Sequence, residues 1–327
     1  MPERELTFAQ AVREALAEEM RRDSRVCIFG EDVAEAGTPF KVLSGLVEEF
    51  GRERVLDTPI SEAGFTGIGV GAAMTGLRPV VDIMFGDFLT LTMDQMVNQA
   101  AKVHYMSGGH WKVPMVVRTT LGATRRSAAQ HSQSLHAWFS HVPGLKVVLP
   151  STPYDAKGLL KTAIRDENPV VFFEDKMMYK LKGAVPEEDY TIPLGLADVK
   201  RSGDDITLVA TSSMVQVALA AAVLLERENI SAEVVDPRTT WPLDEKTILD
   251  SVKKTSRVIV MDEGYGRYGV AAELAAVIAE GAFYDLDAPV KRMGAMHVPI
   301  PFSPPLEDVT VPTEASVFEA ARKMCGK

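Results

Sequence analysis

Short apolar segments alternate with segments of helical periodicity along most of this chain, and this alternation restricts the fold more than any other feature. In the first half, strands are expected at residues 26–29, 55–56, 78–85, 115–119, 146–149 and 170–173. Helices are expected at residues 8–20, at a segment ending near 50, at 87–105 and at 154–165. Strands that alternate with helices form parallel sheets covered by helices on both faces. The sequence therefore predicts an α/β fold.

A break in the periodicity separates this first series from a second one. Residues 176–203 contain two prolines and clustered charges, which are typical of a surface linker. Strands are then expected at residues 206–210, 232–235, 257–261 and 290–293, with helices at 214–228, 244–253, 269–280 and 314–324. A chain of 327 residues is long enough for two domains. We expect two parallel-sheet domains, at residues 1–190 and 191–327.

Charge, cysteine content and hydrophobicity exclude several classes of protein. The formal net charge of −10 makes nucleic acid a poor partner. Cys27 and Cys325 form no metal-binding or redox spacing, which fits a reducing cytoplasm. The longest apolar run, residues 217–225, is too short to cross a bilayer, so no membrane association is expected. Thr7 and Gln10 form a capping box near the first residue, so no signal or transit peptide is expected.

The stretch from residue 55 to residue 76 places one carboxylate at a change from strand to helix. Pro59 ends a short strand, Ser61 is a natural N-cap, and Glu62 then lies in the first helical turn. Five glycines follow, at positions 64, 67, 69, 71 and 76. Each would weaken a solvated helix by roughly 1 kcal/mol relative to alanine, which is reasonable if a backbone or flat ligand approaches closely. Alternatively, Glu62 only complements the helix dipole.

Two further side chains are candidates because of where they lie. Phe88 follows an expected strand end, where α/β sheets place ligands, and could stack on a flat ring, although ordinary core packing is the alternative. His131 lies in a long polar loop, residues 121–134, after Arg125 and Arg126. A solvent-exposed histidine without a function is the alternative there. The spacing of His131, His136 and His141 does not resemble a zinc site.

The segment Asp57-Thr58-Pro59-Ile60-Ser61-Glu62 resembles the signature of the beta subunit of thiamine-diphosphate-dependent 2-oxo acid dehydrogenases. This family includes the pyruvate, branched-chain and acetoin dehydrogenase complexes. Similar stretches occur at residues 143–148, 155–160, 163–166, 193–195 and 236–239, so the resemblance covers nearly the whole chain. It implies a pyrimidine-binding domain followed by a transketolase C-terminal-type domain.

The resemblance implies a role for each candidate residue. Glu62 matches the glutamate that hydrogen-bonds N1′ of the cofactor's aminopyrimidine and so promotes the imino form that takes the C2 proton. Phe88 matches the stacking aromatic, and Ile60 and Met84 match neighbouring contacts to the cofactor. His131 matches a histidine at the mouth of the active site, which orients the substrate or protonates an intermediate during acyl transfer to lipoamide.

The resemblance also implies a potassium site in the first domain. Its ligands would be Asp166 and Asn168 together with the carbonyls of Met115, Ala163 and Ile164. Oxygen ligands suit a hard cation. From the residues alone, a helix C-terminus with solvated polar groups is the simpler interpretation.

The segment that binds the cofactor's diphosphate is missing from this sequence. That end of the cofactor needs Mg²⁺ held by a Gly-Asp-Gly segment and a downstream asparagine, and the nearest approach, residues 203–205, opens a strand in the other domain. The diphosphate and Mg²⁺ are therefore expected on an alpha subunit, with the site at the interface of an α2β2 tetramer.

The leading functional hypothesis is oxidative decarboxylation of a 2-oxo acid, pyruvate above all, with acyl transfer to lipoamide on an acyltransferase core. The nearest alternative is cleavage of acetoin by an acetoin dehydrogenase. A different class is a non-catalytic assembly subunit, against which the Glu62, Phe88 and His131 set argues. A self-sufficient transketolase-like enzyme would need a diphosphate-binding half that 327 residues do not contain.

Overall fold

A computed structural model describes residues 4–327, which form two compact units. The first unit consists of the chain up to Leu121 together with Trp138–Leu194. The second consists of Gly122–Ala137 and Gly195–Lys327. The chain therefore leaves the first series of strands and helices once, for a short loop that belongs to the second unit. Each unit is described below by itself.

The first unit is built on a parallel sheet with the strand order β6-β7-β5-β4-β2-β3. Its strands are β2 (Val26–Gly30), β3 (Val55–Asp57), β4 (Arg78–Ile83), β5 (Val116–Leu121), β6 (Lys146–Val148) and β7 (Val170–Asp175). A small antiparallel pair, β1 (Glu5–Thr7) and β8 (Lys182–Ala184), stands beside it. Because the main strands are parallel, their carboxyl ends all lie along one side of the sheet, called its carboxyl edge below. In α/β proteins, ligands bind at this side.

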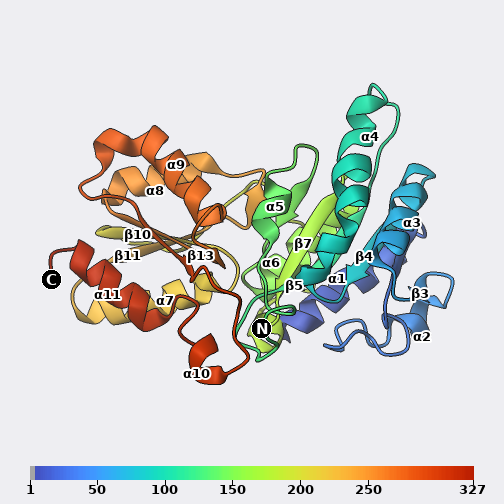
Figure 1. Cartoon of the computed structure of the whole chain (residues 1–327), viewed down its shortest axis with the longest axis horizontal. Helices are drawn as coiled ribbons and strands as arrows, with labels where there is room; N and C mark the ends of the chain where they lie inside the picture. The colour runs from blue at the N-terminus through green and yellow to red at the C-terminus, as the bar shows by residue number, and fades with distance from the viewer. Residues whose placement is uncertain (1–3) are drawn as a thin grey trace. The chain divides into compact units, whose positions relative to one another are not determined.

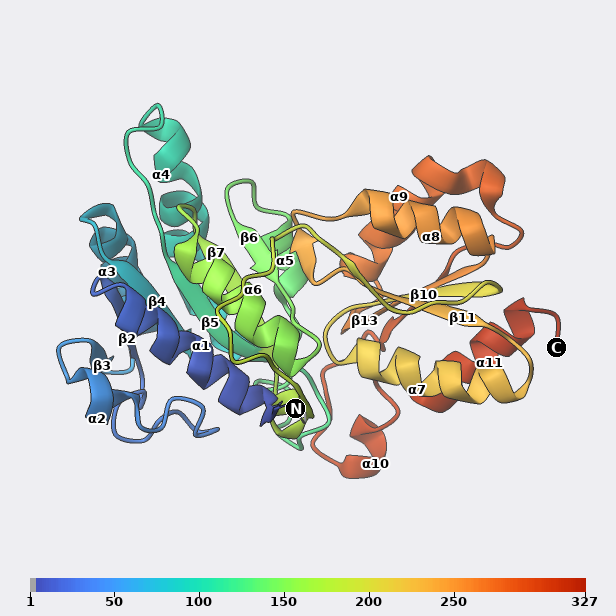
Figure 2. The same cartoon turned by 180° about the vertical axis from the view of Figure 1, so that it is seen from behind.

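Helices cover both faces of this sheet (Figures 1 and 2). The helices are α1 (Phe8–Arg22), α2 (Leu46–Phe50), α3 (Glu62–Met74), α4 (Ala101–Met106), α5 (His136–Ser140), whose last three residues belong to this unit, α6 (Pro153–Arg165) and a 3₁₀ turn, Met178–Lys180. Helices α1 and α6 lie on one face, and α3 and α4 lie on the other. The predicted capping box is confirmed, since the Thr7 hydroxyl accepts from the Gln10 amide and the Gln10 side chain accepts from the Thr7 amide.

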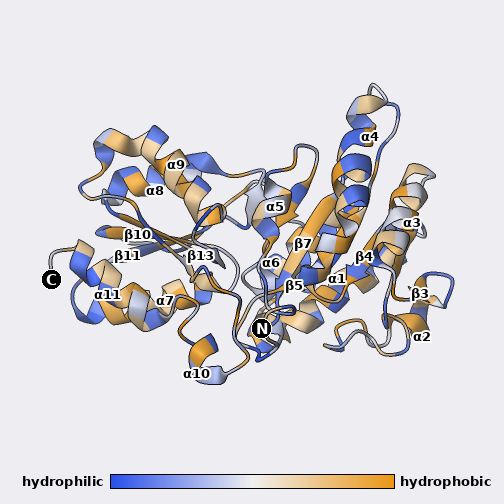
Figure 3. Cartoon of the chain, viewed as in Figure 1, coloured by the Kyte–Doolittle hydropathy of each residue, from blue (hydrophilic) through white to orange (hydrophobic). Residues whose placement is uncertain are grey.

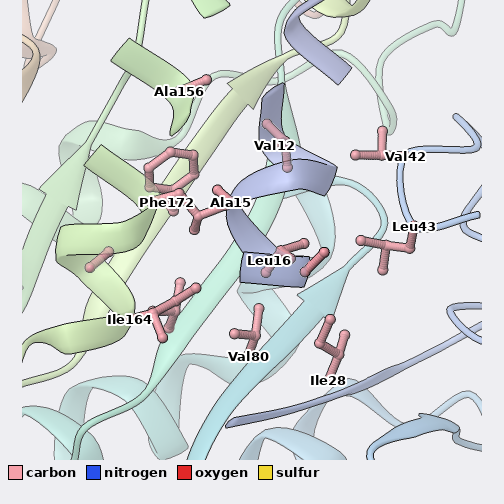
Figure 4. Close-up of a cluster of buried hydrophobic side chains, with 14 of the residues drawn as sticks. Val12, Ala15, Leu16, Ile28, Val42, Leu43, Val80, Ala156, Ile164 and Phe172 are labelled. Carbon is pink, nitrogen blue, oxygen red and sulfur yellow. The ribbon is translucent and has the colours of Figure 1, made fainter. Parts of the chain in front are cut away.

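The core between α1, α6 and the sheet follows from alternation along the strands. In β4, Val80 faces α1 while Val81 faces α3, because successive side chains of a strand point to opposite faces. Figure 4 shows Leu16 of α1 near Ile28 and Val80 of the sheet, with Val12 one turn away in the same cluster. All of these side chains are essentially inaccessible to solvent. This packing fixes the sheet whose carboxyl edge carries the candidate site.

The prediction of an α-helix at residues 87–105 is wrong for about the first two-thirds of that segment. The chain there forms a 3₁₀ helix, Gly86–Thr92, then a π-helical segment, Asp94–Ala100, before α4 begins at Ala101. A Cβ at position 86 would lie 2.6 Å from the carbonyl oxygen of Thr120, so the chain leaves β4 pressed against β5. The hydroxyls of Thr90 and Thr92 donate to carbonyls three residues earlier, which supports the tighter 3₁₀ winding.

The second unit contains a five-stranded sheet with the order β14-β13-β10-β11-β9. Its strands are β9 (Asp198–Arg201), β10 (Ile206–Ala210), β11 (Ala232–Asp236), β13 (Val258–Tyr265) and β14 (Lys291–Ala295), and the short strand β12 (Thr239–Trp241) is not part of this sheet. Strand β9 was not predicted, because it falls within residues 176–203, and it runs antiparallel to β11. The sheet is therefore parallel except at this edge.

Helices also cover both faces of the second sheet. They are α7 (Met214–Arg227), α8 (Glu245–Thr255), α9 (Val270–Ala282), a 3₁₀ turn (Phe283–Asp285), α10 (Pro304–Glu307) and α11 (Glu314–Met324). Helices α7 and α11 pack on one face, and α8 and α9 pack on the other (Figures 1 and 2). The predicted α/β class is confirmed in both units.

The distribution of hydropathy agrees with these layers. Figure 3 shows strands β7 and β10 mostly hydrophobic, while α8 alternates between hydrophobic and hydrophilic residues. This is the pattern expected of a buried strand and of a helix with one face in water. Within residues 4–327, no helix combines the length and the apolar character needed to span a membrane.

Candidate functional site

Glu62 is the first residue of α3, at the carboxyl edge of the first sheet. Strand β3 ends at Asp57, and the amide of Thr58 donates to the carbonyl of Gly30 at 2.9 Å, which ties this turn to the end of β2. Ser61 occupies the N-cap position as predicted, but its side chain makes no capping hydrogen bond. Glu62 is only 7% exposed. A carboxylate is thus held largely away from water at the positive end of a helix.

The glycines of α3 differ in how closely the rest of the chain approaches them. At position 69 a Cβ would lie 2.6 Å from Cγ2 of Val81, so glycine is needed for α3 to pack closely on β4. At position 71 a Cβ would meet nothing within 4 Å. Close approach within the chain therefore explains one of the predicted glycine positions, whereas Gly71 lies on the exposed side of the helix.

Three candidate side chains lie near Glu62 in the topology because they follow β3 and β4, the two neighbours of β2. Ile60 lies two residues before the first residue of α3 and is 82% exposed. Met84 and Phe88 follow β4 and are half-buried. The Phe88 ring meets that of Phe85 edge to face, with ring centroids 5.9 Å apart. An exposed aliphatic group, a thioether and a braced aromatic ring thus gather at one sheet edge.

A second buried carboxyl group at this edge was not singled out from the sequence. Glu31 follows β2, is 7% exposed, and in the described chain its Oε1 atom has no hydrogen-bond partner. Burial, and then the negative charges of Glu62, Asp32 and Asp82, raise the pKa of Glu31. An orphaned buried oxygen beside a second carboxylate is typical of a site completed by a ligand or partner. The signal was the pair Glu31-Asp32 directly after a buried strand.

His131 belongs to the second unit, since it lies in the segment Gly122–Ala137, called the histidine loop below. His131 is half-buried, and its amide donates to the carbonyl of Ala128 at 3.4 Å. The neighbouring Ser132 is buried and lines a small pocket together with Glu263 and Tyr265. The predicted irregular loop is therefore present, and it packs against the end of β13.

Similarity to known proteins decides the family. Residues 4–182 match the family described as transketolase, pyrimidine binding domain, and residues 195–317 match transketolase, C-terminal domain. The acetoin:2,6-dichlorophenolindophenol oxidoreductase subunit beta of Bacillus subtilis (strain 168) is 51% identical over 336 residues, covering 99% of this chain and 98% of the relative. The pyruvate dehydrogenase E1 component subunit beta of Rickettsia felis is 48% identical over 321 residues, covering 98% of each. The 2-oxoisovalerate dehydrogenase subunit beta of Bacillus subtilis is 46% identical over 321 residues, also covering 98% of each.

The chain belongs to the beta-subunit family of the thiamine-diphosphate-dependent 2-oxo acid dehydrogenases. The predicted resemblance is thereby confirmed, together with the order of its two domain types. A solved chain described as a split gene transketolase, in an inactive beta4 tetramer, has a TM-score of 0.78 at 23% identity and covers 98% of each chain. At that identity it supports the shared fold alone.

Two of the residues predicted to bind potassium, Asp166 and Asn168, lie at the end of α6. Asp166 is the C-cap of α6, and the Asn168 amide and side chain both donate to its Oδ1, at 2.9 and 3.1 Å. The carbonyl of Met115 accepts from the amide of Val170, two residues after Asn168. Two cations already contact this set, since Arg78 donates to the Ile164 and Asp166 carbonyls and Lys146 pairs with Asp166 Oδ2.

A carbonyl oxygen has two lone pairs, so these contacts leave acceptor capacity for a further cation. Their positive charges nevertheless oppose one, because like charges repel across a few ångström. Among residues 4–327, no group of three or more His, Cys, Asp and Glu side chains is arranged to hold a metal ion. Any cation in this region would therefore be held mainly by carbonyl and amide oxygens.

Proposed function

We propose that this chain is the beta subunit of the decarboxylase component of a 2-oxo acid dehydrogenase complex, with pyruvate as the 2-oxo acid. The observation that supports a catalytic rather than a purely structural subunit is the buried pair of carboxyl groups, Glu62 and Glu31, at the ligand-binding edge of the first sheet. Burying two neighbouring carboxyl groups costs free energy. A catalytic role would explain why they are kept, whereas a docking subunit would not need them.

The residues at that edge fit the aminopyrimidine half of thiamine diphosphate. Bound there, the cofactor would supply the nucleophilic carbon that attacks the 2-oxo group and the cationic ring that takes up the electron pair left behind when CO₂ departs. Glu62 would hold a proton at N1′ of the ring, and Phe88 would stack on its face. Ile60 and Met84 would cover its edges and exclude water. The orphaned Oε1 of Glu31 is consistent with a site that a ligand completes.

The charged half of the cofactor requires a partner. We propose an alpha subunit that holds Mg²⁺ and the diphosphate, in an α2β2 heterotetramer, and a lipoyl acyltransferase core that receives the acyl group. His131 would orient the substrate or donate a proton during that transfer.

We also propose a domain boundary between residues 190 and 191. A cytoplasmic location is proposed as well, and the two free cysteines support that location.

Acetoin cleavage is the second candidate function, because a relative at 51% identity is named for acetoin. The decisive experiment is co-expression with a candidate alpha subunit, followed by assays with pyruvate, branched-chain 2-oxo acids and acetoin. Reduction of 2,6-dichlorophenolindophenol reports electron release from each substrate. Turnover with pyruvate alone supports the proposal, and turnover with acetoin alone replaces it with the second candidate. A tetramer that binds the acyltransferase but turns over none of these substrates would identify a docking subunit.

Potassium is expected to stabilise the first unit through the oxygens near Asp166. A ligand that binds only the folded state at a hundred times its Kd adds about 2.7 kcal/mol of stability. The measurement is urea unfolding of the assembled protein in potassium chloride and in tetramethylammonium chloride at equal ionic strength. Asn168→Ala should abolish the difference, while Asn98→Ala, an exposed amide on the other face of the sheet, should preserve it. Equal unfolding free energies in both salts would show that potassium does not stabilise this region and that Arg78 and Lys146 already neutralise its oxygens.

A further inference from the structure

Three carboxylates of the second unit hold the histidine loop at separate points. The first contact is at the start of the loop, where the amide of Ala123 donates to Oε1 of Glu263 at 2.5 Å. The second oxygen of Glu263 accepts from the Ser213 hydroxyl at 3.1 Å, which orients the carboxylate. Ala123 is also buried in an apolar cluster with Ile300 and Val311. The start of the loop is thus fixed by both polar and apolar contacts.

The second contact holds the loop five residues before His131. The amide of Arg126 donates to both oxygens of Glu307, at 3.3 and 3.2 Å, and its Nη1 donates to Oε2 at 2.7 Å. The Glu307 side chain is fully buried, whereas Arg126 is 35% exposed. Arg126 also pairs with Asp308, but that carboxylate is 54% exposed. A buried charge-assisted contact is worth more than an exposed one, so Glu307 is the stronger of the two neighbours.

The third contact lies five residues after His131. Nε2 of His136 is 2.9 and 3.1 Å from the two oxygens of Asp262, and both side chains are 1% exposed. The Thr211 hydroxyl and the Gly264 amide also donate to Asp262. Burial disfavours the charged carboxylate, but the contact with His136 and these donors lower the pKa of Asp262 overall. The end of the loop therefore rests on a carboxylate kept in its ionised form.

The backbone between these contacts is strained. Thr124, Arg126 and Ala128 have φ values of 66°, 60° and 61°, in the left-handed region. Each such residue costs about 1–2 kcal/mol when it is not glycine. Strain of this kind persists only where surrounding contacts fix the conformation, and it occurs most often at functional sites. The three carboxylates supply such contacts on both sides of His131.

We propose that Asp262, Glu263 and Glu307 are positioning residues, which hold the histidine loop in one conformation and thereby set where His131 acts. The inference rests on the proposed role of His131 in acyl transfer. None of the three carboxylates needs to touch the substrate. Their effect is to prevent the strained loop from relaxing. This matters for the reaction because misplacement of a reacting group by about 1 Å can cost on the order of 100-fold in rate.

The first test measures the loop directly and needs no catalytic activity. Glu307→Gln replaces two acceptor oxygens by one and places an NH₂ group against the Arg126 donors. In the assembled heterotetramer, hydrogen exchange across residues 123–137 should accelerate about tenfold or more, the factor expected when local opening becomes about 1.4 kcal/mol easier. Asp308→Asn, at the next residue along the chain, should leave exchange unchanged. Arg126→Gln is the second variant, because its partly exposed side chain makes a folded product easier to obtain.

The second test compares two partial reactions. Glu307→Gln should slow acyl transfer to a lipoyl domain on the order of 10- to 100-fold. Dichlorophenolindophenol reduction should change much less, since it does not require the transfer. His131→Ala should give the same pattern, and the double variant should be no worse than His131→Ala, because the two residues act through one step.

The outcomes separate this inference from the proposed function. Unchanged exchange in Glu307→Gln and Arg126→Gln, or equal loss of both partial reactions with a doubly impaired double variant, would refute the positioning role. A wild-type tetramer without turnover on any substrate would instead refute the proposed function. The exchange experiment would then still decide whether the carboxylates hold the loop.

Discussion

Replacing Glu62 with glutamine is expected to reduce turnover of the assembled enzyme by about 10²- to 10⁴-fold, the range typical of a positioned proton-transfer group. Glutamine keeps the shape of the side chain but cannot hold an exchangeable proton between its oxygen and a ring nitrogen. The side chain is buried at the start of α3, so water cannot easily replace the lost carboxyl group. The measurement is the rate of dichlorophenolindophenol reduction at saturating pyruvate.

The alternative interpretation of Glu62 makes a different prediction. A carboxylate that only complements the helix dipole contributes about 0.3–1 kcal/mol of stability and nothing to turnover. Glu48 offers a matched control, because it is exposed in the first turn of α2. Glu48→Gln should therefore lower the free energy of unfolding slightly and leave turnover intact. Near-normal turnover in Glu62→Gln, with bound cofactor verified by calorimetry, would reduce Glu62 to the same structural role.

Local signals made the surroundings of Glu62 predictable from the sequence. A short strand, a proline that ends it and a helix start all lie within a few residues, so the position of the carboxylate follows from short-range rules. The strand and helix series were predictable for the same reason, since each element carries its own periodicity. The burial of Glu62 was harder to foresee, because it depends on the turn being tied to β2 through Thr58 and Gly30.

The features that could not be predicted depend on contacts between residues that are far apart in the sequence. The amide of Ala123 meets Glu263 across 140 residues, and Arg126 meets Glu307 across 181 residues. No local pattern encodes such pairs, so the membership of the histidine loop in the second unit had to come from the structure. The same holds for β9, which forms an antiparallel sheet edge in a stretch without clear periodicity.

A buried ion triad in the first sheet is the second feature with a large expected effect. Asp82 on β4, Arg118 on β5 and Glu174 on β7 are each 3% exposed or less. Arg118 contacts both oxygens of Glu174, at 2.5 and 2.7 Å, and also pairs with Asp82. Each of the three charges lies in a strand that also contains several apolar residues. Only the strand order, which makes β5 the neighbour of both β4 and β7, shows that the charges meet.

Replacing Arg118 with methionine is expected to lower the free energy of unfolding by about 3–5 kcal/mol, because two buried carboxylates would lose their cation. Arg21→Met is the matched control. Arg21 also makes a two-point contact with a carboxylate, Glu49, but its side chain is 56% exposed, so the loss should stay below about 1 kcal/mol. Urea unfolding of both variants at pH 7 gives the comparison.

The pH dependence of the Arg118→Met variant provides a second, independent readout. Burial raises the pKa of both Asp82 and Glu174, while Arg118 opposes that rise, so removing the arginine should raise both values further. A raised pKa in the folded state means that the folded protein binds more protons than the unfolded chain. Stability from these groups is then fully present below the ordinary carboxyl pKa of about 4 and is lost as the pH rises through the folded value.

The stability deficit of Arg118→Met relative to the wild type should therefore be larger at pH 8 than at pH 5. Adding Asp82→Asn and Glu174→Gln to this variant should recover most of the lost stability, since neutral amides need no cation, and should remove the pH dependence of the deficit. A deficit that is equal at both pH values and persists in the triple variant would mean that the cost is lost packing around the guanidinium rather than uncompensated charge.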